Sequence, residues 1–282
     1  MNVILPEKPK ILNRRNVTYM TILIVCAVAV AIAMYQFFSE EKLGVIIGIT
    51  KDENEEINQL RTEFNSLFTN ELKIEKIELD QNIKKDEQEK DIVYTGYQKE
   101  EKSVNNYSLD VKLPYININS DVTKKFNEKI QKIFENPAED ILQTENRNII
   151  YTVNYAAFIE NDILSIAIIS TFKEDNNVQR TIFKVYNYNI KNNEEATLDD
   201  FTTIKNIDKQ DLEDTIKFEI KNSQVQTEQL KELGYDIFSR DINDEMYKVE
   251  NATDYFIYDG YLYIIYAYGN TNNTSEMDIV II

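Results

Sequence analysis

One long apolar segment stands near the N-terminus of the chain. Val17–Phe38 contains 22 residues and no charged side chain. A helix of a soluble core would show a polar face with a period of 3.6 residues, and this segment has none. As a helix it would measure about 33 Å, which is sufficient to cross a hydrocarbon layer of about 30 Å. The pattern therefore predicts one transmembrane helix at 17–38.

The charges that flank this segment predict its orientation. Four basic residues precede it, whereas Glu40 and Glu41 follow it. Because basic flanks stay in the cytoplasm, residues 1–16 should form a short cytoplasmic tail and residues 39–282 should lie outside the cell. A cleaved signal peptide is the alternative, since Ala31-Ile32-Ala33 has the form of a cleavage site. The apolar run continues past that site, which favours the membrane anchor.

A juxtamembrane helical segment and linker are predicted at 39–91. Apolar residues recur there at helical spacing, which predicts a helix that packs on its own domain: Ile57, Leu60, Phe64, Leu67 and Phe68. Asp80–Asp91 is polar throughout and is typical of a solvated linker or loop.

From Ile92 onward the pattern alternates between strands and helices, which predicts an extracellular domain at 92–282. Ile92–Tyr97 and Tyr107–Ile116 read as a hairpin joined by the polar loop Gln98–Asn106. A helix follows, with Ser120 as its N-cap and Asn136-Pro137 as its end.

The remainder of the domain follows the same pattern. Asp208 opens a second long helix, and Asp259-Gly260 marks the turn of a closing hairpin. Further strands are predicted at Ile149–Ile159, Ile163–Phe172, Val178–Tyr188 and Ile279–Ile282. This order predicts an α+β fold, a mainly antiparallel sheet with two or three packed helices, preceded by one transmembrane helix.

Composition excludes several classes of function. The chain has no His and a single Cys, which removes His-dependent catalysis, most zinc and copper sites, and disulfide frameworks. Its net charge of -18 opposes binding to nucleic acid. Residues 39–282 carry 48 acidic and 27 basic side chains, a balance of -21. The expected extracellular part is therefore strongly acidic, and no cofactor is expected.

The candidate reactive groups each have a simpler structural interpretation. Adjacent carboxylates such as Glu194-Glu195 and Asp199-Asp200 lie in polar segments, whereas a glycosidase needs one carboxylate whose pKa is raised by burial. Asp175-Asn176-Asn177 and Asp241–Glu245 offer oxygen ligands but lack the spacing of a calcium loop. The tyrosines at 255–268 suit sugar or protein contacts, and cross-strand tyrosine pairs also stabilise sheets. No catalytic, metal-binding or cofactor-binding residue is predicted.

Three segments carry a resemblance to a known domain. Val111–Ile130 (VKLPYININSDVTKKFNEKI) is a strand followed by a helix, Tyr186–Asn189 precedes Leu198–Phe201, and Tyr255–Ile282 is a closing hairpin with a final strand. They resemble a bacterial extracellular domain of unknown general function, found in the lysozyme-sensing anti-sigma factor RsiV and in the N-terminal, non-catalytic part of the deacetylase PdaC. The resemblance covers about residues 92–282 and implies an α+β fold with a sensing or ligand-binding role.

The chain departs from that family where function is concerned. Many members carry a glycine- and histidine-containing segment where this chain has Ser170–Asn177, so no ligand contact is carried over through it. The 16 residues before the membrane segment are too few for a sigma-binding module, and a metal-dependent deacetylase needs His residues. The resemblance therefore implies fold and topology and does not imply either activity.

The sequence as a whole predicts a single-pass cell-envelope protein with a non-catalytic extracellular domain that binds or senses a ligand. The expected partners are the membrane and either a cationic wall-active protein or a wall polymer, because an acidic domain accelerates encounter with cations. Two alternatives stay open, a wall-modifying hydrolase that uses two carboxylates and a structural subunit of an envelope complex. A pocket with a buried carboxylate would favour the first alternative, and an exposed apolar patch would favour the second.

Overall fold

The structure is a computed structural model that describes residues 51–74, 83–145, 147–268 and 276–282. The predicted cytoplasmic tail and transmembrane helix lie outside the described residues. Among the helices that are described, none is long and apolar enough to cross a membrane. The chain divides into two compact units, 1–60 and 61–282, and the second contains both sheets.

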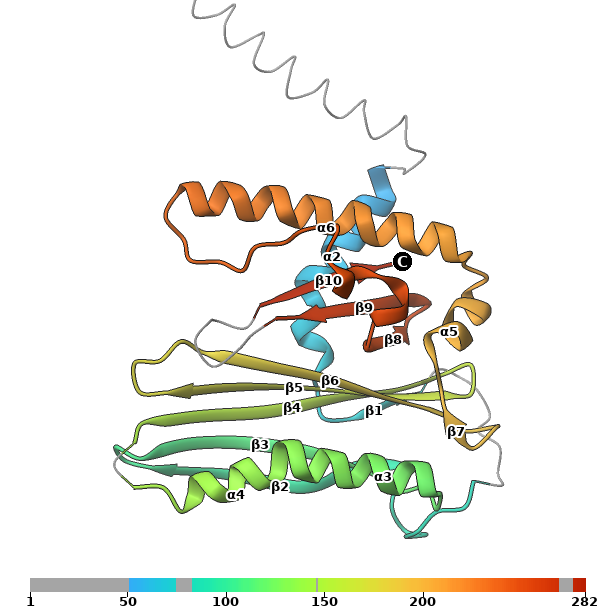
Figure 1. The fold of residues 1–282 in the computed structure, drawn as a ribbon. Helices are drawn as coiled ribbons and strands as arrows, with labels where there is room; N and C mark the ends of the chain where they lie inside the picture. The colour runs from blue at the N-terminus through green and yellow to red at the C-terminus, as the bar shows by residue number, and fades with distance from the viewer. Residues whose placement is uncertain (1–50, 75–82, 146, 269–275) are drawn as a thin grey trace, which may run out of the picture. The chain divides into compact units, whose positions relative to one another are not determined.

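The larger sheet has the strand order β2-β3-β4-β5-β6-β7, and β1 also pairs with β4 (Figure 1). Most neighbours are antiparallel, as predicted, but β3 and β1 run parallel to β4. β3 follows β4 up to Val111 opposite Val153, and β1 pairs with the later part of β4 from Leu72 opposite Ala157. The strands are β1 Leu72–Ile74, β2 Val93–Ser103, β3 Tyr107–Ile116, β4 Ile149–Glu160, β5 Ile163–Glu174, β6 Arg180–Asn189 and β7 Glu194–Glu195.

The first hairpin is longer than the sequence pattern indicates. The prediction of a polar loop at Gln98–Asn106 was wrong, because β2 continues to Ser103 and pairs there with Tyr107. β2 is an edge strand, so its polar side chains face water without breaking the ladder. Charged residues are common on such edges because they discourage pairing with other chains, and Lys99 forms an ion pair with Glu101 at 3.0 Å.

One long helical segment covers a face of the large sheet. It consists of α3 Asp121–Ile130, a π-helical turn Gln131–Glu135, and α4 Asn136–Leu142. Ser120 is the N-cap, as predicted, and its hydroxyl accepts a hydrogen bond from the amide of Thr123 at 3.2 Å. Its apolar residues enter the core of the large sheet, namely Phe126, Ile130, Phe134, Ala138 and Ile141.

The predicted end of this helix at Asn136-Pro137 was wrong. Pro137 lies in the first turn of α4, directly after the π-helical turn. In a regular helix its ring would clash with the carbonyl four residues earlier, but the preceding turn is wider, with the Asn136 amide bonded to the Gln131 carbonyl. The proline therefore continues the helix instead of ending it.

The smaller sheet has the order β10-β9-β8 and carries the second core. The predicted turn is confirmed, with φ of 53° at Asp259 and 74° at Gly260. The predicted N-cap at Asp208 is confirmed as well, since its carboxylate accepts a hydrogen bond from the Gln210 amide at 2.7 Å. The elements are α5 Leu198–Lys205, α6 Lys209–Glu232, β8 Asp254–Tyr258, β9 Tyr261–Ala267 and β10 Met277–Ile281.

Aromatic side chains join the two sheets. Phe158 of β4 stacks on Phe256 of β8 with ring centres 5.4 Å apart, and Phe256 stacks on Tyr263 of β9 at 4.8 Å. The segment that follows α2 Lys51–Glu63 contributes to the same contact, because Phe64 lies 5.9 Å from Phe183 of β6 and 6.4 Å from Tyr263. Burial of Phe64 and Leu67 confirms that the end of this predicted helix packs on its own domain.

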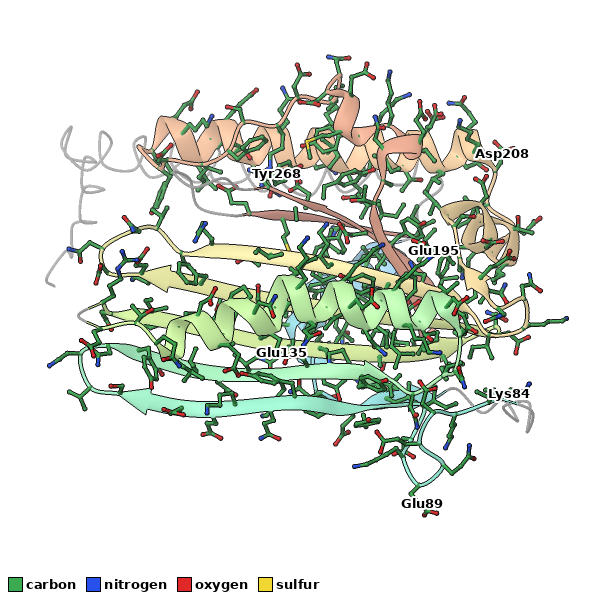
Figure 2. The ribbon with its side chains drawn as sticks, turned by 60° about the horizontal axis from the view of Figure 1, so that its bottom comes forward. Lys84, Glu89, Glu135, Glu195, Asp208 and Tyr268 are labelled. Atoms are coloured by element: carbon green, nitrogen blue, oxygen red, sulfur yellow. The ribbon has the colours of Figure 1, made fainter. Side chains whose placement is uncertain are left out.

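The described part of the predicted linker, residues 83–91, has no helix or strand, but hydrogen bonds to a buried side chain hold it on the domain. Asn117 is fully buried and its side-chain amide donates to the carbonyls of Glu87, Lys90 and Asp91 at 2.7–3.3 Å. Its side-chain oxygen accepts from the Glu87 amide at 2.8 Å. Figure 2 shows Glu89 at the tip of this loop, so the polar residues there are a solvated turn on the domain.

Candidate functional site

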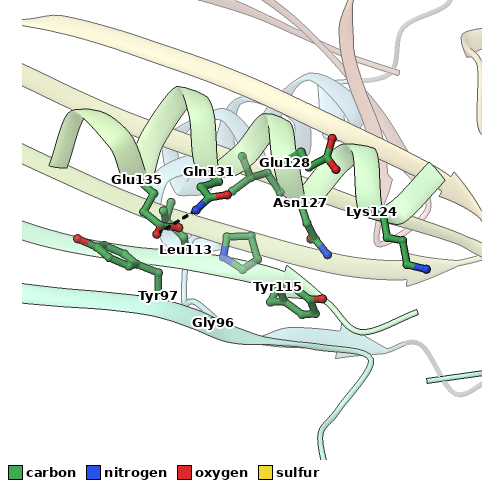
Figure 3. Close-up of a pocket in the computed structure, with 11 residues that line it drawn as sticks. Gly96, Tyr97, Leu113, Tyr115, Lys124, Asn127, Glu128, Gln131 and Glu135 are labelled. Carbon is green, nitrogen blue, oxygen red and sulfur yellow. Dashed lines mark hydrogen bonds between the residues drawn. The ribbon is translucent and has the colours of Figure 1, made fainter. Parts of the chain in front are cut away.

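A groove lies between the β2–β3 hairpin and the long helix that covers the large sheet (Figure 3). Its volume is about 370 Å³, and we call it the helix–hairpin groove. The lining residues come from both elements: Gly96, Tyr97, Leu113, Pro114 and Tyr115 from the hairpin, and Lys124, Asn127, Glu128, Ile130, Gln131 and Glu135 from the helix.

The floor of the groove is formed by a β-bulge. Thr95 pairs with Pro114 and Tyr97 pairs with Leu113, so Gly96 is the extra residue on β2. Pro114 has no amide hydrogen, and a bulge is one of the places where a strand tolerates proline. A Cβ on residue 96 would lie 2.6 Å from the Cβ of Tyr115, so only glycine fits without a shift. Gly96 thus leaves room for the Tyr115 side chain, and Leu113 and Pro114 line the groove beside the two tyrosines.

Two tyrosine rings line the hairpin side of the groove, and both are held in place. The Tyr97 hydroxyl donates to Glu139 at 2.6 Å. Partial burial, together with the bond to Glu139 and its charge, raises the pKa of Tyr97, which keeps its hydroxyl protonated. The Tyr115 ring packs on Tyr94 with ring centres 5.4 Å apart. Both rings are thus positioned before any ligand arrives.

Polar side chains of one helix face form the opposite wall. Lys124, Glu128, Gln131 and Glu135 are separated by three or four residues, so they follow one stripe of the helix. Gln131 donates to Glu135 at 3.5 Å. Asn127 lies among them and pins the helix to the hairpin, because its amide exchanges two hydrogen bonds of 3.0 Å with the backbone of Ile116.

The carboxylates of the groove are more exposed to solvent than the ion-paired carboxylates in the interior of the domain. Glu128 is exposed and Glu135 is half-buried. The buried carboxylates Asp254 and Asp278 lie outside the groove and are ion-paired with Lys184 at 3.0 Å and Arg240 at 3.1 Å. The groove therefore offers aromatic faces and hydrogen-bonding groups, which are features of a binding site.

The carboxylates that were considered as candidate reactive groups are exposed or accept hydrogen bonds from backbone amides. Glu194 and Glu195 are exposed in β7, and Asp200 accepts from the Thr197 amide at 2.7 Å in a capping box. Asp175 accepts from the Asn148 amide at 2.9 Å, and Asp241 accepts from the Asn243 amide at 2.9 Å. Across the described ranges, no group of three or more Asp, Glu, Cys or His side chains could hold a metal ion.

The tyrosines at 255–268 serve mainly as core residues. Tyr263, Tyr266 and Tyr268 are buried, and the Tyr268 hydroxyl donates to Asp278 at 2.7 Å. Burial, followed by the charge of Asp278, raises the pKa of Tyr268. The hydroxyls of Tyr247 and Tyr268 also share a hydrogen bond. This part of the chain supports the structural interpretation of its tyrosines.

The groove itself was not anticipated from the sequence. The signal that could have indicated it is the pair Gly96 and Pro114, which interrupt two otherwise regular strand patterns. Both residue types mark bulges within strands. The register that brings Pro114 next to the bulge at Gly96, and the helix that approaches them, depend on the tertiary fold.

Comparison with solved structures shows similarity to a domain of unknown function. No family model matches the chain, and no curated protein matches it. The chain is similar to the crystal structure of a DUF3298 family protein from Pseudomonas aeruginosa, with 8% sequence identity and a TM-score of 0.36. The match covers 64% of this chain and 83% of that chain. DUF denotes a domain of unknown function, and the resemblance to the domain of RsiV and PdaC stays a prediction.

Proposed function

We propose that the chain is a single-pass cell-envelope protein, anchored by residues 17–38, whose extracellular domain binds an envelope ligand without catalysing a reaction. The anchor and its orientation rest on the uncharged segment and its basic N-terminal flank. The ligand is a cationic wall-active protein or a wall polymer. The net charge of -21 in residues 39–282 supports a cationic protein as the ligand, because a strongly acidic domain accelerates encounter with cations.

The helix–hairpin groove is the observation that carries the binding role. It combines two fixed tyrosine rings with water-facing carboxylate, amide and ammonium groups. Pockets of about 300–1,000 Å³ are typical of ligand sites, and this groove lies within that range. A hydrolase would need a lining carboxylate whose pKa is raised by burial, whereas Glu128 faces water.

A role as a subunit of an envelope complex is the second candidate, and one observation favours it. Large apolar side chains are exposed on the later part of α6 and on the loop after it: Val225, Leu230, Leu233, Tyr235 and Phe238. Exposed apolar patches are common at protein interfaces. Co-purification of the chain with a stoichiometric membrane partner that Leu233→Glu abolishes would support this candidate.

The topology is tested by external protease on cells whose wall has been removed. The acidic domain after Phe38 should be digested in intact cells, because the basic flank holds the N-terminus in the cytoplasm. Protection of the domain, with digestion confined to residues 1–16, would reverse the orientation and end the proposal of an extracellular receptor.

The binding role is tested by titrating the full-length protein in detergent with a lysozyme at about 0.15 M salt, where the screening length is about 8 Å. A shaped interface should keep a measurable affinity there. The control is the same chain unfolded in urea, which carries the same charges. Equal binding by both forms would reduce the effect to charge alone, and a separate titration with wall fragments tests the polymer.

A further inference from the structure

The two tyrosines of the helix–hairpin groove form a pair of fixed platforms. The Tyr97 hydroxyl is bonded to Glu139, and the Tyr115 ring packs on the Tyr94 ring, with its Cβ in the space that a side chain at Gly96 would need. In Figure 3 the two rings stand apart on the hairpin, with Gly96 between them on the strand. A ligand that stacks on them finds rings that are already ordered, which reduces the entropy cost of binding.

The helix wall, opposite the two rings, supplies hydrogen-bonding groups along the length of the groove. Lys124 and Glu135 are eleven positions apart, which corresponds to about 16 Å of helix. Glu128 and Gln131 lie between them and are exposed, so their oxygens and nitrogens are accessible to a ligand. The groove is thus elongated, with flat apolar surfaces on the hairpin side and polar groups on the helix side.

The helix wall carries charges of both signs, two carboxylates and one ammonium, and the Lys124 ammonium donates to Asn119 at 3.0 Å. A partner rich in Lys and Arg would be attracted by Glu128 and Glu135 but repelled by Lys124 at the end of the same stripe. An uncharged ligand meets no such conflict, and both amide and charged side chains hydrogen-bond to hydroxyls. The mixed wall therefore favours a neutral, hydroxyl-rich ligand.

We propose that the helix–hairpin groove binds an oligosaccharide, with sugar rings stacked on Tyr97 and Tyr115 and hydroxyls bonded to the helix stripe. A pyranose has an apolar C–H face and a polar rim, which correspond to the two walls of the groove. Tyrosine offers both a flat apolar ring and a hydroxyl for such contacts. This inference rests on the proposed binding role and narrows its ligand from an envelope component to a glycan.

The experiment uses the full-length protein in a zwitterionic detergent without a sugar headgroup. The probe is an oligosaccharide of N-acetylglucosamine, and binding is followed by calorimetry and by tyrosine fluorescence, which no tryptophan obscures in this chain. Because the probe is neutral, its affinity should be nearly unchanged between low and high salt. A strong salt dependence would contradict stacking and hydroxyl recognition.

Variants locate the site. Tyr97→Ala and Tyr115→Ala should each weaken binding about three- to tenfold, the equivalent of one aromatic contact. Tyr97→Phe keeps the ring but removes its bond to Glu139, so the affinity should fall less than in Tyr97→Ala. Tyr235→Ala is the matched control, because Tyr235 is 61% exposed on the loop after α6 and far from the groove in sequence. Gln131→Ala tests the helix wall at an exposed position where folding is not at risk.

The outcomes separate this inference from the proposed function. Sugar binding that the groove variants weaken and Tyr235→Ala does not would support the glycan site. Binding of a lysozyme without binding of the sugar would overturn the glycan inference and leave the receptor role standing. Sugar binding that is indifferent to Tyr97, Tyr115 and Gln131 would overturn the assignment to this groove. Absence of binding to the sugar, lysozyme and wall fragments would overturn both proposals.

Discussion

Asn117 shows how a single buried side chain can order a polar segment. Residues 83–91 are polar except for Ile83, which packs against the core of the large sheet. For the polar part of the loop, Asn117 supplies four hydrogen bonds to the backbone of Glu87, Lys90 and Asp91. A solvated loop pattern is therefore compatible with a defined position on the domain.

Replacing Asn117 by Ala should lower the free energy of unfolding by about 2–3 kcal/mol, because several backbone groups would lose their partner in a buried place. Thermal and urea denaturation measure this change. Asn119→Ala is the matched control, since Asn119 is exposed and surface substitutions usually change stability by less than about 0.5 kcal/mol. Equal losses in both variants would mean that the Asn117 bonds do not hold the loop.

At the scale of elements, the apolar periodicity was a better guide than the residues that usually end an element. In α6, Leu212, Ile216 and Ile220 recur every four residues along one helix face, and all three are fully buried. The predicted helix end at Asn136-Pro137 was wrong, and so was the predicted loop at Gln98–Asn106. A π-helical turn accommodates the proline, and an edge position allows β2 to be polar. Neither circumstance is visible in the local sequence.

The short segment Phe64–Leu67 is another element whose role depends on its surroundings. Phe64 is 2% exposed and contacts Phe183 and Tyr263, which belong to different sheets. Arg61, one turn earlier, is ion-paired with Glu219 of α6 at 2.7 Å and donates to the Ile279 carbonyl of β10 at 3.2 Å. The end of the predicted juxtamembrane helix is thus a structural part of the domain.

Phe64→Ala should destabilise the domain by about 3–5 kcal/mol, since it leaves a cavity where the two sheets meet. Phe218→Ala on the outer face of α6 is the control, because that ring is 41% exposed and should cost much less. The midpoint of urea denaturation distinguishes the two variants. If Phe64→Ala unfolded no more easily than Phe218→Ala, residues 61–68 would have to be regarded as an attached linker.

At the scale of the whole molecule, buried tyrosines occur in both cores. The chain has 18 Tyr and no Trp, and several of its hydroxyls are buried. Burial raises the pKa of Tyr186, Tyr247 and Tyr263 to about 12 each. In the unfolded chain these hydroxyls would titrate near the ordinary pKa of about 10. The folded state therefore holds protons that the unfolded state releases.

Stability should be independent of these tyrosines below a pH of about 10 and should fall between about 10 and 12. Each buried tyrosine should contribute a loss of about 1.4 kcal/mol per pH unit over that interval, because the unfolded state loses its proton first. Tyrosinate absorbance, recorded with melting temperature, checks this. Full ionisation of all tyrosines near pH 10 with the fold intact would contradict burial of these hydroxyls.

The sequence by itself determined the features that depend on local spacing and on composition. These are the apolar segment at 17–38 as a predicted span, the α+β class, the hairpin turn at Asp259-Gly260, the caps at Ser120 and Asp208, and the acidic charge. Each follows from chemistry within a few residues or from sums over the chain.

Only the tertiary structure decided which strands are parallel, where β1 pairs, and where a ligand can bind. The helix–hairpin groove needs a bulge at Gly96 next to the Thr95–Pro114 pair, Tyr97 bonded to Glu139, and a helix that continues past Pro137. These partners are up to 42 positions apart in the chain. No local pattern encodes such contacts, because they arise when the sheet brings distant segments together and side-chain packing selects their register.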